Sequence, residues 1–241
     1  MKLFYSVILV FFLSVSSVNA CPALEKMGMP VSNDSGLILL CRHLYATDYN
    51  TVTKTPKWSA EDLTADNASG PENRTNPFKA DPDLQPGNRA ELSDYQHSGY
   101  SRGHMSPAGD FRKEYMVESF YLSNMVPQVQ NCNNAGIWSN IEEVVRGWAV
   151  KYGELYVVTG PIYENGITNV IGNKVAIPSH LFKVIYNPVL QQSVAFIVEN
   201  KSLCDTEPSD VVVSQDAVEG LTGLRFFPNI TNYTRSNIIW K

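Results

Sequence analysis

The stretch AGIWSNIEEVVRGWAVKY, residues 135–152, carries the clearest structural signal in the chain. Its apolar residues recur at the spacing that places them on one face of a helix. These apolar residues are Ile137, Ile141, Val144, Val145 and Trp148. Gly153 follows directly, and glycine is the residue that most often ends a helix. We therefore predict a helix over residues 135–152 that ends at Gly153.

Strand-like segments surround this helix in the sequence, because apolar and β-branched runs alternate with turn residues. The predicted strands cover residues 36–49, 54–63, 120–122, 155–159, 181–186 and 194–198. A short helix is predicted over residues 215–221, and the Asn-, Pro- and Gly-rich residues 66–89 predict an extended loop. The pattern indicates a mixed α+β fold with a mainly antiparallel sheet. No linker divides residues 21–241, so we expect a single domain there.

The first twenty residues have the composition of a cleavable leader. Lys2 precedes an apolar run over residues 3–13, and the segment ends in Val18-Asn19-Ala20. This order is typical of a secretory signal peptide, and the apolar run is shorter than a membrane span. We therefore expect a signal peptide over residues 1–20, a secreted or periplasmic protein, and no membrane contact after cleavage.

The chain contains four cysteines, at positions 21, 41, 132 and 204. An even number in an exported protein predicts two disulfides, and the absence of a CxxC pair argues against a zinc site. The sequence allows three pairings. Of these we favour Cys21 with Cys41 and Cys132 with Cys204.

The net charge is low for a nucleic-acid-binding protein. It is -5 for the whole chain, and removal of Lys2 with the leader lowers it to -6. Tight binders neutralise phosphates with an excess of Lys and Arg. The acidic balance argues against a high-affinity binder. It is compatible with an enzyme, which needs positive charge only beside the scissile phosphate.

The densest group of catalytic residue types is SGYSRGH, residues 98–104. His104 can take a proton from water near neutral pH, because the pKa of imidazole lies close to that range. Arg102 can bind a phosphate oxygen, and Gly103 permits close approach of the backbone. Taken alone, this short motif is a weak signal, since a single histidine is more often structural.

A second group lies on and before the predicted helix. Glu142 and Arg146 lie one turn apart on nearly the same face. Asn134 would lie roughly 80° from Glu142 around the helix, whereas Asn133 would lie on the opposite face. Taken alone, this pattern is more typical of a surface ion pair with Asn134 as a helix cap.

Together these groups resemble the DNA/RNA non-specific endonuclease family, whose members include secreted bacterial nucleases and mitochondrial endonuclease G. The similarity extends from about residue 37 to residue 227. The segments that carry it are residues 74–82, 94–95, 98–108, 124–128 and 134–146. The resemblance implies a ββα-metal active-site motif with one prominent metal-binding helix.

The resemblance also implies a role for each matching residue. His104 would be the general base. Asn134, or alternatively Asn133, would be the one protein ligand of a hydrated Mg²⁺ ion, which Mn²⁺ could replace. Glu142 would act on that ion through water. The residues implied to face the phosphate or to order the site are Arg74, Arg102, Arg146 and Asn124.

Ser101 departs from the family pattern, which usually has Asp at this position. The serine can keep a hydrogen bond to a neighbouring loop, but it loses a charge. We therefore expect the activity to be reduced or altered.

The spacing before the helix also departs from the family pattern, by one extra residue between Gln128 and Trp138. Counting forward from the preceding motif gives Asn133 as the metal ligand, and counting back from Trp138 gives Asn134. The helical-face argument favours Asn134.

The sequence therefore predicts a secreted, Mg²⁺-dependent endonuclease. It would hydrolyse DNA and RNA without strong sequence specificity and leave 5′-phosphate ends. The alternative is a non-catalytic, secreted nucleic-acid-binding protein on the same fold, consistent with Ser101 and the acidic charge. The preference between DNA and RNA, the oligomeric state and any protein inhibitor stay open.

Overall fold

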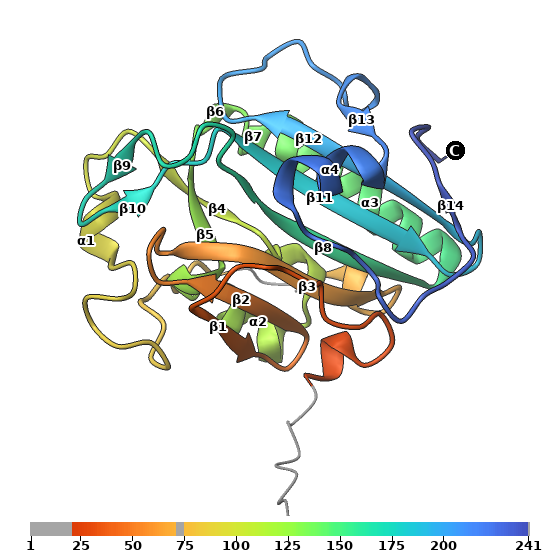
Figure 1. The fold of residues 1–241 in the computed structure, drawn as a ribbon, viewed down its shortest axis with the longest axis horizontal. Coiled ribbons are helices and arrows are strands. Elements are labelled where there is room, and N and C mark those ends of the chain that lie inside the picture. The colour runs from red at the N-terminus through yellow and green to blue at the C-terminus, as the bar shows by residue number, and fades with distance from the viewer. Residues whose placement is uncertain (1–20, 71–74, 241) are drawn as a thin grey trace, which may run out of the picture.

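The computed structural model describes residues 21–70 and 75–240 (Figure 1). Within these residues an eight-stranded sheet forms the centre of the molecule. Its strands are β1 Leu37–Cys41, β2 Tyr45–Asn50, β3 Thr55–Thr64, β8 Glu154–Ile162, β11 His180–Asn187, β12 Gln192–Glu199, β13 Val212–Val213 and β14 Thr234–Arg235. The order is β1-β2-β3-β8-β11-β12-β13, and β14 adds to β12 in parallel. The other neighbours are antiparallel, so the expected fold class is confirmed.

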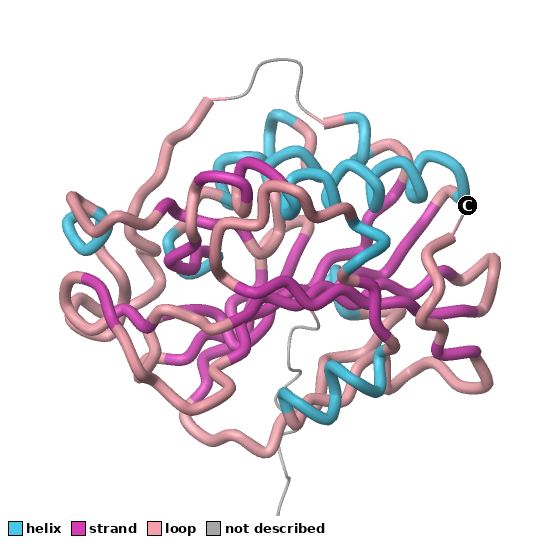
Figure 2. Tube along the Cα trace, turned by 90° about the horizontal axis from the view of Figure 1, so that it is seen from above, coloured by secondary structure: helices cyan, strands magenta, loops and turns pink. Residues whose placement is uncertain are grey.

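Helices cover both faces of this sheet (Figure 2). The α-helices are α1 Leu92–Tyr95, α2 Lys113–Ser119, α3 Ile137–Tyr152 and α4 Gln215–Thr222. On one face, α3 packs through Ile141 and Trp148 against Val157. On the other face, α4 packs through Val218 against Val184. The sheet is therefore buried on both sides, and within the described residues no helix has the length and apolar character needed to cross a membrane.

The long helix ends where the sequence predicts, but it begins at Ile137 and not at residue 135, because Ala135 and Gly136 form the short strand β7. All its predicted apolar positions except half-buried Val144 are buried. At the C-terminal end of α3, the backbone amide of Gly153 donates to the carbonyl of Ala149 at 2.8 Å, and Gly153 has a φ of 92°. This left-handed conformation costs glycine little, so the helix ends there.

Residues 36–49 form a hairpin, and the prediction of a single strand there is wrong. The chain turns between β1 and β2, where the amide of Arg42 donates to the carbonyl of Tyr45 at 2.8 Å. The guanidinium of Arg42 binds Asp81 and Asp83 in the long loop. These contacts with two carboxylates stabilise the turn. The apolar pattern of residues 36–49 does not predict it.

Residues 120–122 do not form a strand, so that prediction is also wrong. Phe120 follows the last residue of α2, and Leu122 begins a 3-10 helix. Tyr121 makes a single bridge to Lys79. Phe120 and Leu122 are fully buried, so the apolar pattern reports burial correctly but not the backbone conformation.

Shorter elements surround the sheet. The remaining strands are β4 Ser101–His104, β5 Met125–Gln128, β6 Asn131–Cys132, β7 Ala135–Gly136, β9 Val170–Ile171 and β10 Val175–Ala176. The 3-10 helices are η1 Pro22–Leu24, η2 Asn67–Ser69, η3 Ala108–Asp110, η4 Leu122–Asn124 and η5 Pro208–Asp210. In sequence order β4, β5 and α3 form a ββα unit, and β4 and β5 are antiparallel. The implied ββα arrangement is therefore present.

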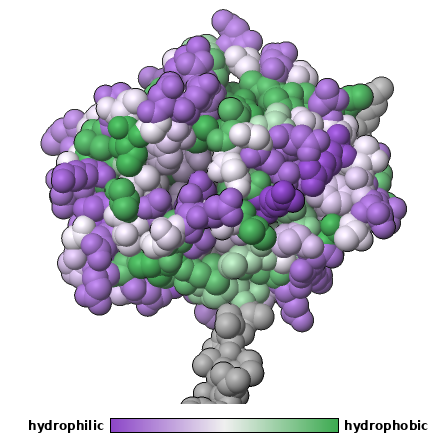
Figure 3. All heavy atoms as spheres, in the orientation of Figure 1, coloured by the Kyte–Doolittle hydropathy of each residue, from purple (hydrophilic) through white to green (hydrophobic). Residues whose placement is uncertain are grey.

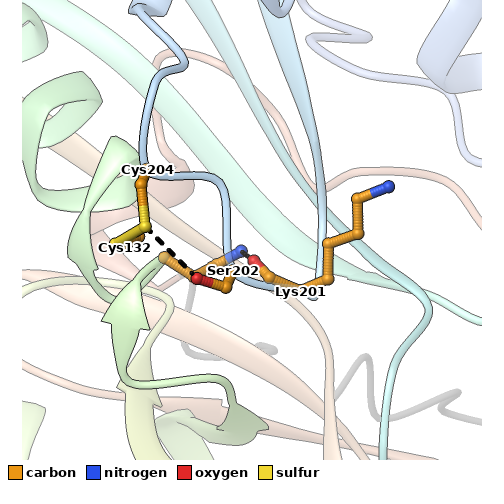
Figure 4. The surroundings of a disulfide bond; sticks show 5 residues. Cys132, Lys201, Ser202 and Cys204 are labelled. Carbon is orange, nitrogen blue, oxygen red and sulfur yellow. Dashed lines mark hydrogen bonds between the residues drawn. A yellow bond between two sulfur atoms is a disulfide. The ribbon is translucent and has the colours of Figure 1, made fainter.

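The favoured disulfide pairing is confirmed. Cys21 pairs with Cys41 and Cys132 with Cys204, with Cα–Cα distances of 5.2 and 4.6 Å. The second bond ties the loop before α3 to the segment after β12, and Ser202 lies beside its sulfur atoms (Figure 4).

One edge of the sheet is apolar. β1 pairs only with β2 in the described structure, and its Ile38 and Leu39 are 39% and 36% exposed. An apolar band lies along the corresponding lower edge of the molecular surface (Figure 3).

The predicted signal peptide and Arg74 lie outside the described residues.

Candidate active site

His104 is the last residue of β4, and its position is set by the pairing of β4 with β5. His104 lies opposite Met125, and Gly103 lies opposite Val126. A Cβ atom on Gly103 would lie 2.8 Å from the Cβ of Gln128, which real side chains do not tolerate. Glycine is therefore required for β5 to approach the strand that carries the histidine.

The imidazole of His104 is held between two aromatic rings. It is 7% exposed, and its ring centroid lies 5.0 Å from that of Phe120 and 5.6 Å from that of Phe78. Phe78 also binds Arg102, whose guanidinium carbon lies 4.1 Å from the ring centroid. Phe78 thus positions two predicted site residues through aromatic and cation–π contacts. This role of Phe78 is not visible in the sequence, because it depends on tertiary contacts alone.

Asn124 orders the backbone around His104 and does not line the cleft. It is fully buried, and its Oδ1 accepts hydrogen bonds from the Ser59 hydroxyl and the Ser106 amide, each at 3.0 Å. Its Nδ2 donates to the carbonyls of Ser106 and Ser119 at 2.8 and 2.9 Å. The side chain therefore joins the sheet, the loop after His104 and the end of α2.

Asn133 is a structural residue in this arrangement. It is fully buried, and its Nδ2 donates to the carbonyls of Glu199 and Lys201 at 2.7 and 2.6 Å. Its Oδ1 accepts a hydrogen bond from the Gln128 amide at 2.8 Å. With its oxygen engaged and no exposed surface, Asn133 fastens the loop before α3 beside the Cys132 disulfide.

Asn134, the next residue, lies in the cleft. Its Nδ2 donates to the Ser101 hydroxyl at 3.1 Å and to Oε1 of Gln130 at 3.2 Å. The Ser101 hydroxyl in turn donates to the carbonyl of Gln128 at 2.9 Å. These contacts orient the carboxamide through its nitrogen, which leaves the oxygen as the atom suited to a cation.

One cleft of about 570 Å³ contains four of the seven predicted site residues that the structure describes. Its lining includes Arg102 and His104 from β4, Asn134 from the loop before α3, and Glu142 from the second turn of α3. These residues come from segments about thirty residues apart in the sequence and converge only in the folded chain. Of the predicted residues, Asn124, Asn133 and Arg146 do not line this cleft.

Arg146 lies one turn beyond Glu142 and binds Asp110. Its Nη1 is 3.0 Å from the Asp110 carboxylate, and a Cβ on Gly109 would lie 3.0 Å from the same nitrogen. Burial lowers the pKa of Arg146, but the charge and hydrogen bond of Asp110, together with the charges of Glu142 and Glu143, outweigh this effect and raise the pKa. Asp110 follows the His104 segment by six residues, so this ion pair joins the helix to that segment.

A buried carboxyl group lies behind this ion pair. Glu61 on β3 is 2% exposed, and burial, then the charge of Asp110, raises its pKa well above the usual value. Burial also raises the pKa of Asp110, although Arg146 and Lys183 oppose the shift. Lys183, itself 1% exposed, donates to the Thr159 hydroxyl at 2.7 Å. A set of ionisable side chains therefore extends from the side of the site formed by α3 into the core; its members are Arg146, Asp110, Glu61 and Lys183.

The donor set suits a hard divalent cation that keeps most of its water. Among the described residues, no group of three or more His, Cys, Asp or Glu side chains is placed to hold a metal ion. Asn134 and Glu142 both supply oxygen atoms to the cleft. Oxygen ligands in small number are the preference of Mg²⁺, whereas zinc prefers nitrogen and sulfur ligands.

Comparison with known proteins agrees with this geometry. Residues 22–232 match the family described as DNA/RNA non-specific endonuclease. The chain is 36% identical to the mitochondrial nuclease EXOG of Xenopus laevis over 226 residues, which cover 86% of this chain and 62% of that protein. It is 35% identical to the mitochondrial nuclease of Saccharomyces cerevisiae, covering 78% of this chain and 65% of that protein. The chain thus spans less than two thirds of the length of these two relatives.

A solved structure of an EndoG/EndoGI complex has a similar fold. The similarity has a TM-score of 0.76 and 32% sequence identity, and covers 86% of this chain and 91% of that chain. The shared fold extends well beyond the cleft residues.

The expectation of a secreted or periplasmic protein is contradicted by these relatives. The frog and yeast proteins are named as mitochondrial nucleases. A short apolar run after one lysine resembles an export signal, but such a pattern does not by itself identify the compartment.

Proposed function

Because the chain belongs to the DNA/RNA non-specific endonuclease family, we propose that it is a nuclease that uses a divalent cation, Mg²⁺ in the first place, to hydrolyse DNA and RNA. The convergence of His104, Arg102, Asn134 and Glu142 on one cleft is the observation that carries the proposal. These residues combine a base, a phosphate-binding cation and oxygen ligands, which is the set that metal-assisted phosphodiester hydrolysis requires.

His104 would act as the general base. Its imidazole would take a proton from the water that attacks phosphorus, and the rings of Phe78 and Phe120 would keep it oriented during this transfer. Attack in line with the departing 3′ oxygen would leave a 5′-phosphate and a 3′-hydroxyl end. A positioned base of this kind contributes roughly 100- to 10,000-fold in rate.

Arg102 would bind a non-bridging phosphate oxygen, with Phe78 supporting its guanidinium from one side. We also propose that Arg146 faces the phosphate. A guanidinium has five N–H donors, and the contact with Asp110 engages only one terminal nitrogen. Arg74 is proposed for the same role on the strength of the family resemblance alone.

Asn134 would hold the cation through Oδ1, and Glu142 would orient water beside it. When bound, the cation would offset negative charge that develops on the phosphate and on the departing oxygen. Asn124 would act indirectly, since it orders the backbone on either side of His104. Contacts made mainly to phosphate and sugar would leave the enzyme with little sequence specificity.

We also propose that residues 21–241 form a single nuclease domain. Leu24 near one end and Trp240 near the other pack into the two cores on opposite faces of the same sheet, which supports this extent. The names of the relatives support a mitochondrial location.

Digestion of plasmid DNA and of RNA, each with Mg²⁺ or with EDTA, tests the function. We expect degradation of both substrates in Mg²⁺ and none in EDTA. A protein that binds nucleic acid in a salt-dependent manner but cuts neither substrate would be the non-catalytic alternative.

The variant His104→Ala tests the assignment of the base. We expect turnover to fall at least about 100-fold in a protein that stays folded at the assay temperature, although the loss of a buried ring lowers its melting temperature. The matched control is His43→Ala, because His43 lies outside the cleft and its side chain is 63% exposed. Wild-type turnover in His104→Ala would show that another group acts as the base.

A further inference from the structure

The cleft has a second wall to which the reaction assigns no role. This wall lies on α1 and the loop after it, and its members are Leu92, Tyr95, Gln96 and Tyr100. Leu92 is 38% exposed and Tyr100 is half-buried, so both present apolar surface to solvent in the cleft. The opposite wall is mainly polar, with Asn134, Ser139 and Glu142 beside the apolar Ala135. The two walls therefore suit different parts of a substrate.

The loop after α1 directs Tyr100 toward this cleft. His97 and Gly99 have φ angles of 54° and 83°, in the left-handed region that reverses the chain over a short distance. The Ser98 hydroxyl donates to the carbonyl of Tyr95 at 2.9 Å and accepts from the amide of Tyr100 at 3.1 Å, which closes the turn. Tyr100 is therefore held directly before the first residue of β4.

Tyr100, Arg102 and His104 follow one another at intervals of two residues and line the same cleft, which Ser101 also reaches beside Asn134. Alternate residues of an extended chain point to the same side and lie about 7 Å apart. Tyr100 is thus one two-residue step from Arg102, the proposed phosphate ligand, and two such steps from His104, the proposed base. This order matches a substrate whose phosphate lies at Arg102 and whose attached nucleoside extends toward α1.

A nucleobase fits the chemistry of the α1 wall. The ring of Tyr100 and the side chain of Leu92 offer flat and apolar contacts, and the Gln96 amide offers both a donor and an acceptor. Base stacking on an aromatic side chain tolerates every base, because each base has a π-face. Such a contact would therefore add affinity without adding sequence preference.

We propose that Tyr100 and the α1 wall form a subsite that stacks an unpaired base of the nucleotide beside the scissile phosphate. This inference rests on the proposed nuclease function and specifies that the base beside the scissile phosphate is unstacked when it binds. A base within a duplex is already stacked and paired, so it must leave the helix before it reaches this wall. The subsite therefore favours single strands and frayed or unpaired regions over intact duplex.

The test measures binding in EDTA, where the strands stay uncut. The probes are a single-stranded thymidine oligonucleotide, an abasic strand of equal length with the same phosphates, and a duplex of equal length. For the wild type we expect tighter binding of the thymidine strand than of the abasic strand. Tyr100→Ala should lower affinity for the thymidine strand about tenfold, and for the abasic strand and the duplex by less than about twofold.

Two further variants separate stacking from folding. Tyr100→Phe keeps the ring and should keep wild-type affinity for all three probes. Tyr115→Ala removes a tyrosine that stacks on His43 outside the cleft, and it should also leave all three affinities unchanged. Equal losses on the thymidine and abasic strands, or no loss on either, would overturn the base subsite. Equal losses on single strand and duplex would overturn the requirement for an unpaired base.

The cleavage assay tests the nuclease function, and the binding assay tests the base subsite, so either proposal can be overturned without the other. If wild-type protein cuts neither DNA nor RNA in Mg²⁺, the proposed nuclease function fails whatever Tyr100 does. If it cuts both but Tyr100→Ala binds the thymidine strand like wild type, the function stands and the subsite is wrong.

Discussion

Asp110 and Arg146 form an ion pair that joins the two halves of the candidate site. The pair spans 3.0 Å between Nη1 and Oδ1, and the Asp110 side chain is 3% exposed. Arg146 belongs to the helix that carries Glu142, and Asp110 to the segment that follows His104. The contact therefore fixes the helix relative to the strand that carries the proposed base.

We expect Asp110→Asn to reduce both stability and turnover. Loss of one partner leaves a partly buried Arg146 without its counter-charge, which costs about 2–3 kcal/mol of unfolding free energy. Turnover should fall about tenfold or more, because a small misplacement of Arg146 would weaken the contact with the phosphate that we propose for it. Urea unfolding and steady-state kinetics measure the two effects.

The control for this variant is Asp216→Asn. Asp216 binds Arg235 on the surface, where its side chain is 64% exposed, so its loss should cost less than about 1 kcal/mol. Similar unfolding free energies for the two variants would contradict a special role for the Asp110 pair.

The two neighbouring asparagines should respond differently to substitution. Asn134→Ala should abolish most activity and leave the unfolding free energy within about 0.5 kcal/mol of wild type, because the side chain lies in the cleft. Asn133→Ala should instead cost about 2–3 kcal/mol, since it leaves buried carbonyls and Gln128 without their partner. The reverse pattern would make Asn133 the cation ligand.

Ser101→Ala should raise the cation concentration required for half-maximal activity. Ser101 accepts a hydrogen bond from Asn134, and loss of a residue that orients a metal ligand typically weakens metal binding 10- to 100-fold. A Mg²⁺ titration of the cleavage rate measures the change. Maximal turnover at saturating Mg²⁺ should be less affected, and an unchanged titration curve would show that Ser101 does not position Asn134.

The two disulfides provide a matched comparison. Replacing Cys132 and Cys204 by Ser should raise the cation requirement, because that bond lies beside the loop that presents Asn134. Replacing Cys21 and Cys41 should leave the requirement unchanged, because that bond joins η1 to β1 away from the cleft. Each replacement should cost about 2–5 kcal/mol of stability. Equal effects of both pairs on the Mg²⁺ titration would contradict this local role.

Glu61→Gln should change how stability depends on pH. Burial, then the charge of Asp110, raises the folded-state pKa of Glu61 above its unfolded value. Between these two pKa values the folded state binds more protons, so the wild-type unfolding free energy should fall as pH rises from about 4.5 upward. Glutamine resembles the neutral acid and cannot ionise. The variant should therefore gain stability relative to wild type between pH 5 and pH 8, measured by urea unfolding.

The control for this measurement is Glu143→Gln on the exposed face of α3. Its stability relative to wild type should be the same at both pH values. If Glu61→Gln also shows no difference between the two pH values, Glu61 is not the group that titrates.

Local patterns in the sequence determined the elements that depend on local interactions. The spacing of Ile137, Ile141 and Trp148 and the glycine at 153 define α3, because a helix and its end depend on residues within one or two turns. The same pattern did not separate β1 from β2. That turn depends on Arg42, whose partners Asp81 and Asp83 lie about forty residues away in the sequence.

The site residues also divide into features that one local element shows and features that depend on tertiary contacts. The motif around His104 and the helix face of Glu142 are visible in the sequence, since each lies within one element. The different positions of Asn133 and Asn134 are not visible in the sequence, because the carbonyls of Glu199 and Lys201 bind the Asn133 side chain in the core and Asn134 lies in the cleft.

The sequence alone therefore determined which residue types are available and on which local element each one lies. Only the tertiary structure decided which of them face each other, such as Phe78 with His104 and Asp110 with Arg146. The physical reason is that these contacts join segments distant in sequence, and their geometry is set by packing of the whole sheet and its helices rather than by any local pattern.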